Sequence, residues 1–199
     1  MEKERFFTSK RMTGLAVLIA LSVVLQILSG IFPSLVPMNF ALIPITLAGI
    51  LYGIIGGAIV GFSCGVVVLV QVITMGGSNL FYQMIWTQDP FVTTLTCLVK
   101  TTVAGVLSGL FYKLTHRKNE LVSVFVAGGI VPIVNTALFI VGCLFMTSVQ
   151  GMAGGQNLLV FIMVGLVGFN FFFELLTSLL VCPTLHKVIG VLKKNFRRK

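Results

Sequence analysis

The stretch at residues 40–73 reads FALIPITLAGILYGIIGGAIVGFSCGVVVLVQVI and is almost wholly apolar. As one helix, at 1.5 Å per residue, it would be about 51 Å long. The hydrocarbon core of a bilayer is only about 30 Å thick, so the stretch cannot cross a membrane once as a single helix. We expect a break at the glycine-rich residues 53–57, with a short span over residues 40–51 and a second span over residues 58–73.

Other apolar runs on both sides of this stretch are also long enough to cross a bilayer. They lie at residues 12–31, 91–114, 121–147 and 158–183. Together the runs predict an all-α integral membrane protein with six transmembrane helices, and we expect residues 1–199 to form one transmembrane domain. The first run is about a full bilayer thickness long and no convincing cleavage site follows it, so we interpret it as a span rather than a signal peptide.

The composition excludes a soluble globular protein. Hydrophobic residues make up 57% of the chain and charged residues only 10%, whereas an ordinary soluble domain has about a quarter of its residues charged. The formal net charge is +9, from 14 Lys and Arg against 5 Asp and Glu. In a soluble chain such an excess would suggest binding to nucleic acid.

The positions of the basic residues indicate orientation instead. All except Lys100 lie in three clusters at the ends of apolar runs. The clusters are Lys3, Arg5, Lys10 and Arg11; Lys113, Arg117 and Lys118; and Lys187, Lys193, Lys194, Arg197, Arg198 and Lys199. Cytoplasmic segments of membrane proteins carry such an excess of Lys and Arg. We therefore expect both termini and the loop at residues 115–120 to be cytoplasmic, and no binding to nucleic acid.

Small residues recur at every fourth position as Gly49, Gly53, Gly57, Gly61 and Gly65. This spacing places small residues on one helix face, where another backbone can approach closely. Since the expected break falls among them, they cannot all form one stripe, and we interpret them as packing positions plus a glycine turn.

Ala16 and Ala20 also lie four residues apart, on one face of the first span near its cytoplasmic end. By itself this pair is a weak sign of helix association, because most multi-span proteins contain several such pairs.

Lys100 lies about nine residues, or roughly 13 Å, from the start of its span, which places a charge near the middle of the membrane. A charged lysine there costs about 2.5 to 3.5 kcal/mol on insertion scales, so it needs a partner or access to water. Three explanations remain open: an ion pair with Glu174, an anionic group of a ligand, or extension of the side chain to an interface. By residue count, Glu174 is expected closer to the cytoplasm than Lys100.

Amide and aromatic side chains near the expected outer side suggest a ligand pocket. Candidate ligand contacts besides Lys100 are Asn39, Gln71, Asn79, Gln83, Trp86 and Asn135. Asn79, Gln83 and Trp86 belong to the longest outer segment, residues 74–90, which has the glycines, aromatics and amides of a ligand-binding lid. The same segment could instead lie at the lipid headgroups, where Trp and Tyr are common. Asn135 could equally hydrogen-bond between helices.

No catalytic or metal-binding motif is present in the sequence. There is no HExxH, no Gly-x-Ser-x-Gly, no phosphate-binding glycine loop with lysine, and no readable cysteine metal site or disulfide framework. We expect neither an enzyme nor a bound cofactor, and the chain cannot itself use ATP.

The segments KRMTGLAVLIAL at residues 10–21 and FALIPITLAGILYG at residues 40–53 resemble the substrate-binding S components of energy-coupling factor (ECF) transporters. The resemblance extends over nearly the whole chain. It implies a vitamin importer subunit of a bacterial plasma membrane that binds its ligand at the outer side. It also implies partners: a membrane coupling subunit, contacted through Ala16 and Ala20, and two ATP-binding subunits that use the ATP.

The segment GGIVPIVNTALFIVG at residues 128–142 is most similar to pantothenate-type S components, and a carboxylate ligand would suit Lys100. Riboflavin is the alternative, because its ring system would suit Trp86 and Tyr82. From a different class, the chain could be a membrane scaffold without a ligand. A secondary carrier is disfavoured, because Glu174 is the single acidic residue expected within the membrane.

Overall fold

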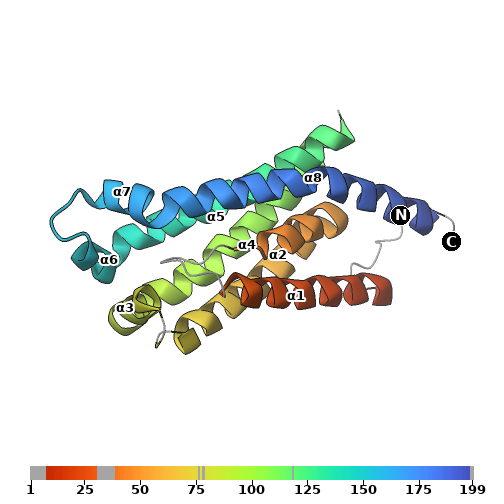
Figure 1. Ribbon diagram of the computed structural model, residues 1–199. Coiled ribbons are helices and arrows are strands. Elements are labelled where there is room, and N and C mark those ends of the chain that lie inside the picture. Colours follow the sequence, from red (N-terminus) through yellow and green to blue (C-terminus); the bar gives the residue numbers. More distant parts are fainter. Residues whose placement is uncertain (1–7, 31–38, 76, 78, 118, 198–199) are drawn as a thin grey trace.

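The computed structural model in Figure 1 describes residues 8–30, 39–75, 77, 79–117 and 119–197, and every regular element among them is a helix. The elements are α1 (Ser9–Ser29), α2 (Leu42–Met75), α3 (Leu80–Gln88), α4 (Pro90–Thr115), α5 (Glu120–Phe145), α6 (Thr147–Met152), α7 (Leu158–Val160), the π-helix η1 (Phe161–Val167) and α8 (Gly168–Arg197). Five helical stretches are long and apolar enough to cross a membrane. They are α1, α2, α4, α5 and the continuous helix Leu158–Lys187.

The break predicted at residues 53–57 of the long apolar stretch is confirmed, and it lies at Gly53. Gly53 has φ 70° and ψ −161°, a conformation that residues with side chains rarely adopt. It divides α2 into a first limb, residues 42–52, and a second limb, residues 54–75. The first limb is only about 16 Å long, about half the thickness of a bilayer core.

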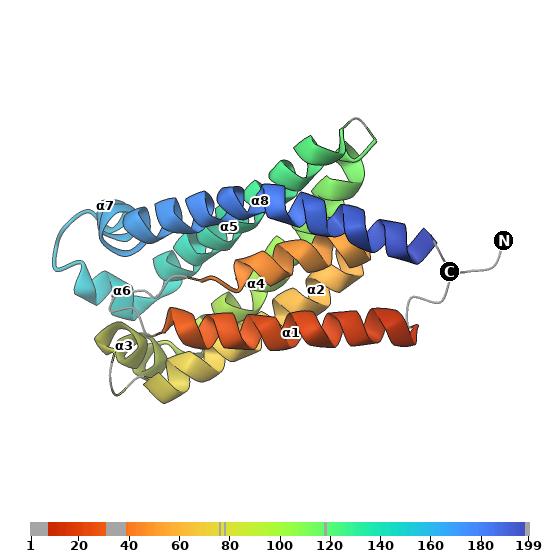
Figure 2. The ribbon, with the colours of Figure 1, turned by 45° about the vertical axis from the view of Figure 1, so that its right-hand side comes forward.

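Both limbs of α2 pack against α4, and they run in opposite directions along it. In the first limb Gly49 lies against Ser108, whereas in the second limb Gly57 lies against Gly105 and Gly65 lies against Cys97. The chain therefore turns back on itself at Gly53, as the two limbs show in Figure 2.

Close backbone contact explains the glycine spacing. A side-chain carbon at Gly57 would overlap the carbonyl oxygen of Gly105, and one at Gly61 would overlap the carbonyl oxygen of Thr101. The expectation that the glycines do not form one stripe is correct. The glycines of both limbs nevertheless face the same helix, α4. In lipid the hydrophobic effect contributes little to the association of helices. Small residues favour association instead, because they let two helices approach closely.

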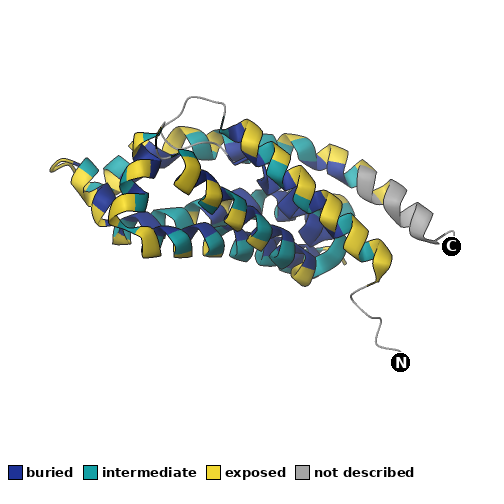
Figure 3. Cartoon of the chain, turned by 90° about the horizontal axis from the view of Figure 1, so that it is seen from below, coloured by how far each residue is buried: buried dark blue, intermediate teal, exposed yellow. Residues whose placement is uncertain are grey.

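The outer surfaces of the helices are apolar. Large exposed side chains include Phe91, Phe145, Val164 and Leu180, each about 70% exposed or more, and Figure 3 shows exposed residues along the outward faces of the helices. Such a surface would be unfavourable in water, and it suits contact with lipid chains.

Several helix ends differ from the sequence-based prediction. The segments expected on the outer side, residues 74–90 and 148–157, hold the short helix α3 and most of α6. The last span was expected to end at Pro183, but the helix continues to Arg197. A proline removes one backbone hydrogen bond and often ends a helix, yet here Pro183 lies inside α8, as Pro132 lies inside α5.

The contact between α2 and α4 gives a matched pair of substitutions. We expect Gly57→Ala to lower the free energy of unfolding by about 1–3 kcal/mol, because the added carbon overlaps backbone that cannot move aside. Gly129→Ala in α5 should be neutral or stabilising, since its nearest neighbour would be 3.8 Å away and Ala favours helices over Gly. Thermal unfolding in detergent measures both, and an equal effect at the two sites would contradict the packing argument.

Candidate ligand site

A cavity of about 40 Å³ lies within the bundle, between α4, α5, η1, α8 and the residues that precede α2. Its lining residues are Asn39, Lys100, Asn135, Thr136, Phe139, Leu166, Val167, Asn170, Phe171 and Glu174. The volume is enough for a few water molecules. The cavity gathers one cation, one carboxylate and three asparagines inside an apolar protein, a combination typical of ligand sites.

Lys100 and Glu174 share this cavity without forming an ion pair. The Nζ atom of Lys100 lies 4.9 Å from the centre of the Phe139 ring, a cation–π contact. No carboxylate oxygen of the described residues lies within 4.0 Å of that ammonium group. Glu174 is 8% exposed, and its Oε1 atom accepts a 2.8 Å hydrogen bond from the backbone N–H of Asn39. The lysine therefore retains its hydrogen-bonding capacity.

Glu174 was expected closer to the cytoplasm than Lys100, and in the structure the two residues line one cavity. Depth was counted from the expected start of each span. The loop between α6 and α7 projects farther than α3 from the body of the bundle (Figures 1 and 2), so the two counts began at different levels.

Two asparagines bring unsatisfied polar atoms to the cavity. The Oδ1 and Nδ2 atoms of Asn39 and the Oδ1 atom of Asn135 are buried, and none has a hydrogen-bond partner among the described residues. The two residues are only 6% and 4% exposed. Folded proteins satisfy nearly all buried polar groups, and each one left unpaired costs about 1–3 kcal/mol. These atoms are therefore suited to bind polar groups of a ligand.

The sequence-predicted site residues separate into two groups. Asn39, Lys100 and Asn135 come together in the cavity, whereas Gln71, Asn79, Gln83 and Trp86 are not among its lining residues.

Gln71 connects α1 with α2. Its Oε1 atom accepts a 2.9 Å hydrogen bond from Nε2 of Gln26, and its own Nε2 atom donates a 2.8 Å bond to the backbone carbonyl of Gln26. Both glutamines are buried, so the pair joins the two helices within the apolar region.

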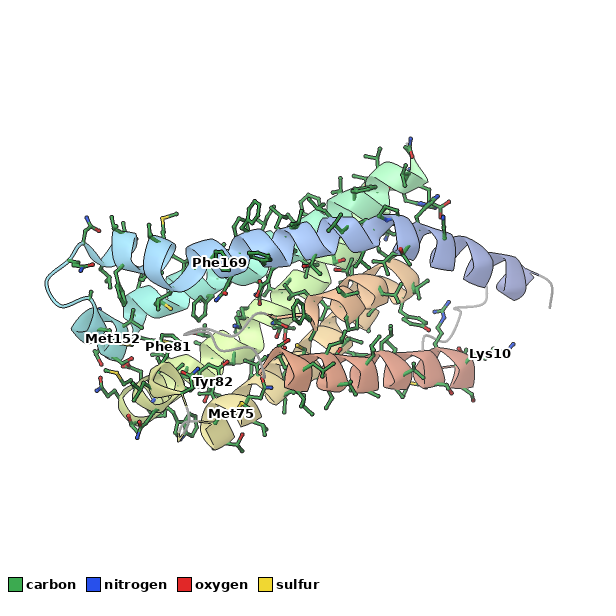
Figure 4. All side chains as sticks on the ribbon, viewed as in Figure 1. Lys10, Met75, Phe81, Tyr82, Met152 and Phe169 are labelled. Atoms are coloured by element: carbon green, nitrogen blue, oxygen red, sulfur yellow. The ribbon has the colours of Figure 1, made fainter. Side chains whose placement is uncertain are left out.

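The other three predicted residues belong to the region of α3. Asn79 caps this helix, with Oδ1 accepting a 3.1 Å bond from the backbone N–H of Tyr82. Gln83 is exposed, and Trp86 is half-buried against the core. Figure 4 shows Phe81 and Tyr82 of α3 at the same end of the bundle as Met152 of α6, with Lys10 at the opposite end.

α3 reaches the cavity through an aromatic contact. Phe81 is 1% exposed, and its ring centre lies 6.3 Å from that of Phe139, which in turn lies beneath the ammonium group of Lys100. The rings of Phe81 and Phe139 thus connect α3 with Lys100.

Asp89, at the end of α3, joins this helix to α6 through hydrogen bonds. Its carboxylate accepts hydrogen bonds of 3.2 and 2.8 Å from the N–H and Oγ1 of Thr147, and one of 2.8 Å from the N–H of Ser148. Partial burial raises the pKa of Asp89, but the hydrogen bonds from Ser148 and Thr147 outweigh that effect and hold the pKa of the carboxyl below its ordinary value. These hydrogen bonds are therefore intact at neutral pH and are lost as acid protonates the carboxylate.

Sequence reasoning did not select several of the cavity residues. They are Thr136, Phe139, Leu166, Val167, Asn170, Phe171 and Glu174. A signal existed for Asn170 and Glu174, which are four residues apart and so share a helix face. Leu166 and Val167 belong to η1, and the placement of a π-helix has no readable sequence signal here.

Comparison with protein families supplies the identity that this geometry leaves open. Residues 10–185 match the family described as ECF transporter, substrate-specific component. The chain belongs to this family. The match confirms the resemblance drawn from the sequence, and comparison with curated proteins gives no matching relative.

Family membership defines the chain as an S component, the substrate-specific subunit of an ECF importer and a multi-pass membrane protein. Proteins of this class bind the transported substrate and are not enzymes. They work with a coupling subunit and ATPases.

The unpaired amide of Asn135 can be tested against the paired amide of Gln71. We expect Asn135→Leu to leave the unfolding free energy unchanged or raised, because it removes a buried oxygen without a partner. Gln71→Leu should lower the unfolding free energy by about 1–3 kcal/mol, because it leaves groups of Gln26 unpaired. Denaturation of both variants in one detergent makes the comparison, and equal destabilisation would show that Asn135 serves structure rather than a ligand.

Proposed function

We propose that this S component captures a water-soluble vitamin, with pantothenate favoured, in the cavity between α4, α5, η1 and α8. The observation that carries the proposal is the set of buried, unpartnered amide atoms of Asn39 and Asn135 beside Lys100 and Glu174. The coupling subunit and two ATP-binding subunits would then drive delivery into a bacterial cell. The chain itself would act as one domain over residues 1–199.

The charges of the site suit a ligand with a carboxylate and hydroxyl or amide groups. Lys100 would bind the carboxylate, exchanging its contact with Phe139 for a charge-assisted hydrogen bond. The carboxylate of Glu174 accepts one hydrogen bond from Asn39 and has room to accept others from hydroxyl groups. The amides of Asn39 and Asn135 can each donate and accept. Pantothenate offers all of these groups.

Binding requires an expansion of the site, because a cavity of about 40 Å³ is too small for a vitamin. α3 is the element suited to move, being joined to the site by Phe81 and to α6 by Asp89. α3 would then act as a lid, and Asn79, Gln83 and Trp86 would contact the ligand as it passes α3. Gln71 would contribute through its bonds to Gln26, which hold α1 in place.

We further propose six membrane crossings with both termini in the cytoplasm. The turn at Gly53 supports the count, because it converts α2 into two segments of opposite direction. The basic residues support the orientation, since the described ones other than Lys100 lie in the first turn of α1, at or just after the end of α4 and in the second half of α8.

The proposal predicts that one vitamin stabilises the purified protein. A ligand at 100 times its dissociation constant adds about 2.7 kcal/mol to the unfolding free energy. We expect pantothenate, within a panel that includes riboflavin and biotin, to raise the thermal midpoint in detergent. Stabilisation by riboflavin alone would mean that riboflavin, not pantothenate, is the substrate, and no response to any vitamin would contradict the proposal that this S component binds a vitamin.

Lys100→Met should abolish the pantothenate-induced shift while the protein still unfolds cooperatively. Lys10→Met, which removes an exposed charge at the far end of the bundle, provides the control and should retain the full shift. A normal shift for Lys100→Met would remove Lys100 from the binding role.

The exposed face of α1 predicts where the coupling subunit binds. Ala16 and Ala20 are both exposed on that helix, so another helix can pack against them. We expect the double substitution of both by Trp to prevent co-purification of the coupling subunit while the vitamin-induced shift persists. Trp at both Leu176 and Leu180, which have the same spacing on the exposed face of α8, is the control and should leave the complex intact. Equal loss of the complex in both proteins would contradict the assignment.

A further inference from the structure

A second and larger hollow lies at the Gly53 turn, at the end of the bundle away from α3 and α6. We call it the turn groove; its volume is about 960 Å³. It is lined by Tyr52, Gly53, Ile54, Ile55, Gly109, Leu110, Tyr112, Lys113, Leu114, His116 and Arg117. It shares no residue with the ligand cavity and has no part in the proposed binding of a vitamin.

Cations form one side of the turn groove. Lys113, His116 and Arg117 are all exposed on or just after the last turn of α4, and no acidic residue is among those that line the groove. The nearest acidic residue in the sequence, Glu120, belongs to the first turn of α5. The ring of His116 stacks on Tyr112 with centres 5.0 Å apart, so its position is fixed beside the groove.

Apolar side chains also line the groove. Ile54, Ile55 and Leu114 are 36%, 52% and 63% exposed. The floor is backbone, because a side-chain carbon at Gly109 would lie 2.7 Å from the amide nitrogen of Ile54. The space above Gly53 is open, with no atom within 4 Å of where its side chain would begin. The groove thus has a rigid floor, a cationic edge and an apolar wall.

We propose that the turn groove binds an anionic phospholipid. Its phosphate would lie against Lys113, Arg117 and His116, and an acyl chain would lie along Ile54, Ile55 and Leu114. Because Ile54, Ile55 and Leu114 are themselves exposed on the surface of the bundle, the lipid would enter from the bilayer. Basic pockets between membrane helices bind acidic headgroups in this way, each Lys or Arg adding to the attraction. Charge complementarity selects an anionic lipid over a zwitterionic one.

The test compares the full-length protein in vesicles of phosphatidylcholine alone with vesicles containing 30 mol% phosphatidylglycerol. Spin-labelled lipids measure the relative affinity of phosphatidylglycerol over phosphatidylcholine at the protein surface. Lys113→Gln combined with Arg117→Gln should lower that preference by about tenfold or more at the preferred site. The charge-matched control, Lys10→Gln combined with Lys187→Gln, should retain it, because neither residue lines the groove.

Two further arms make the outcome decisive. Inorganic phosphate should not displace the bound spin-labelled phosphatidylglycerol, because it has no acyl chain to occupy the apolar wall. The proposal is overturned if the wild-type protein shows no preference for phosphatidylglycerol, if both double variants lose the preference equally, or if phosphate alone competes. Cooperative thermal unfolding of the Lys113/Arg117 variant shows that it is folded. A variant that does not fold is replaced by Leu114→Gln, which removes part of the apolar wall and should also weaken the lipid preference.

Discussion

Backbone contact between α2 and α4 is the constraint on which the rest of this structure depends. Gly57 and Gly61 meet the carbonyl groups of Gly105 and Thr101 with no side chain between them. In lipid, such close packing replaces the hydrophobic force that holds soluble helices together. The contact fixes the depth of α4 against both limbs of α2, and with it the depth of Lys100, which precedes Thr101 in the same helix.

The candidate ligand cavity follows from the shortness of the first limb of α2. This limb spans about half of a bilayer core, because the chain turns at Gly53 and the limb begins at Leu42. Its start leaves Asn39 within the bundle, where the backbone N–H meets Glu174. A full-length helix in this position would fill the space with side chains. The half-length limb instead leaves room beside α8, and polar groups of α4, α5 and α8 border that room.

Much of this arrangement could be predicted from the sequence, because the membrane imposes strong physical limits. A run of 34 apolar residues exceeds a bilayer, which required the break found at Gly53. Lys100 and Asn135 were identifiable because polar groups are costly in lipid. The level of Glu174, the helix α3, the π-helix and the bonds between Gln26 and Gln71 were not predictable. They depend on where each helix begins relative to its neighbours, which a single sequence does not encode locally.

Asp89 and its hydrogen bonds bear on the rate at which a charged ligand associates with the protein. Asp89 is the one charged residue in residues 74–90 and 148–157, and its carboxylate is already occupied by Thr147 and Ser148. With one ionised carboxylate among them, these segments carry little net charge, so they exert only a weak field on a charged solute at a distance. If the ligand enters past these segments as proposed, ionic strength should have little influence on its association rate, and discrimination by charge would begin only at Lys100.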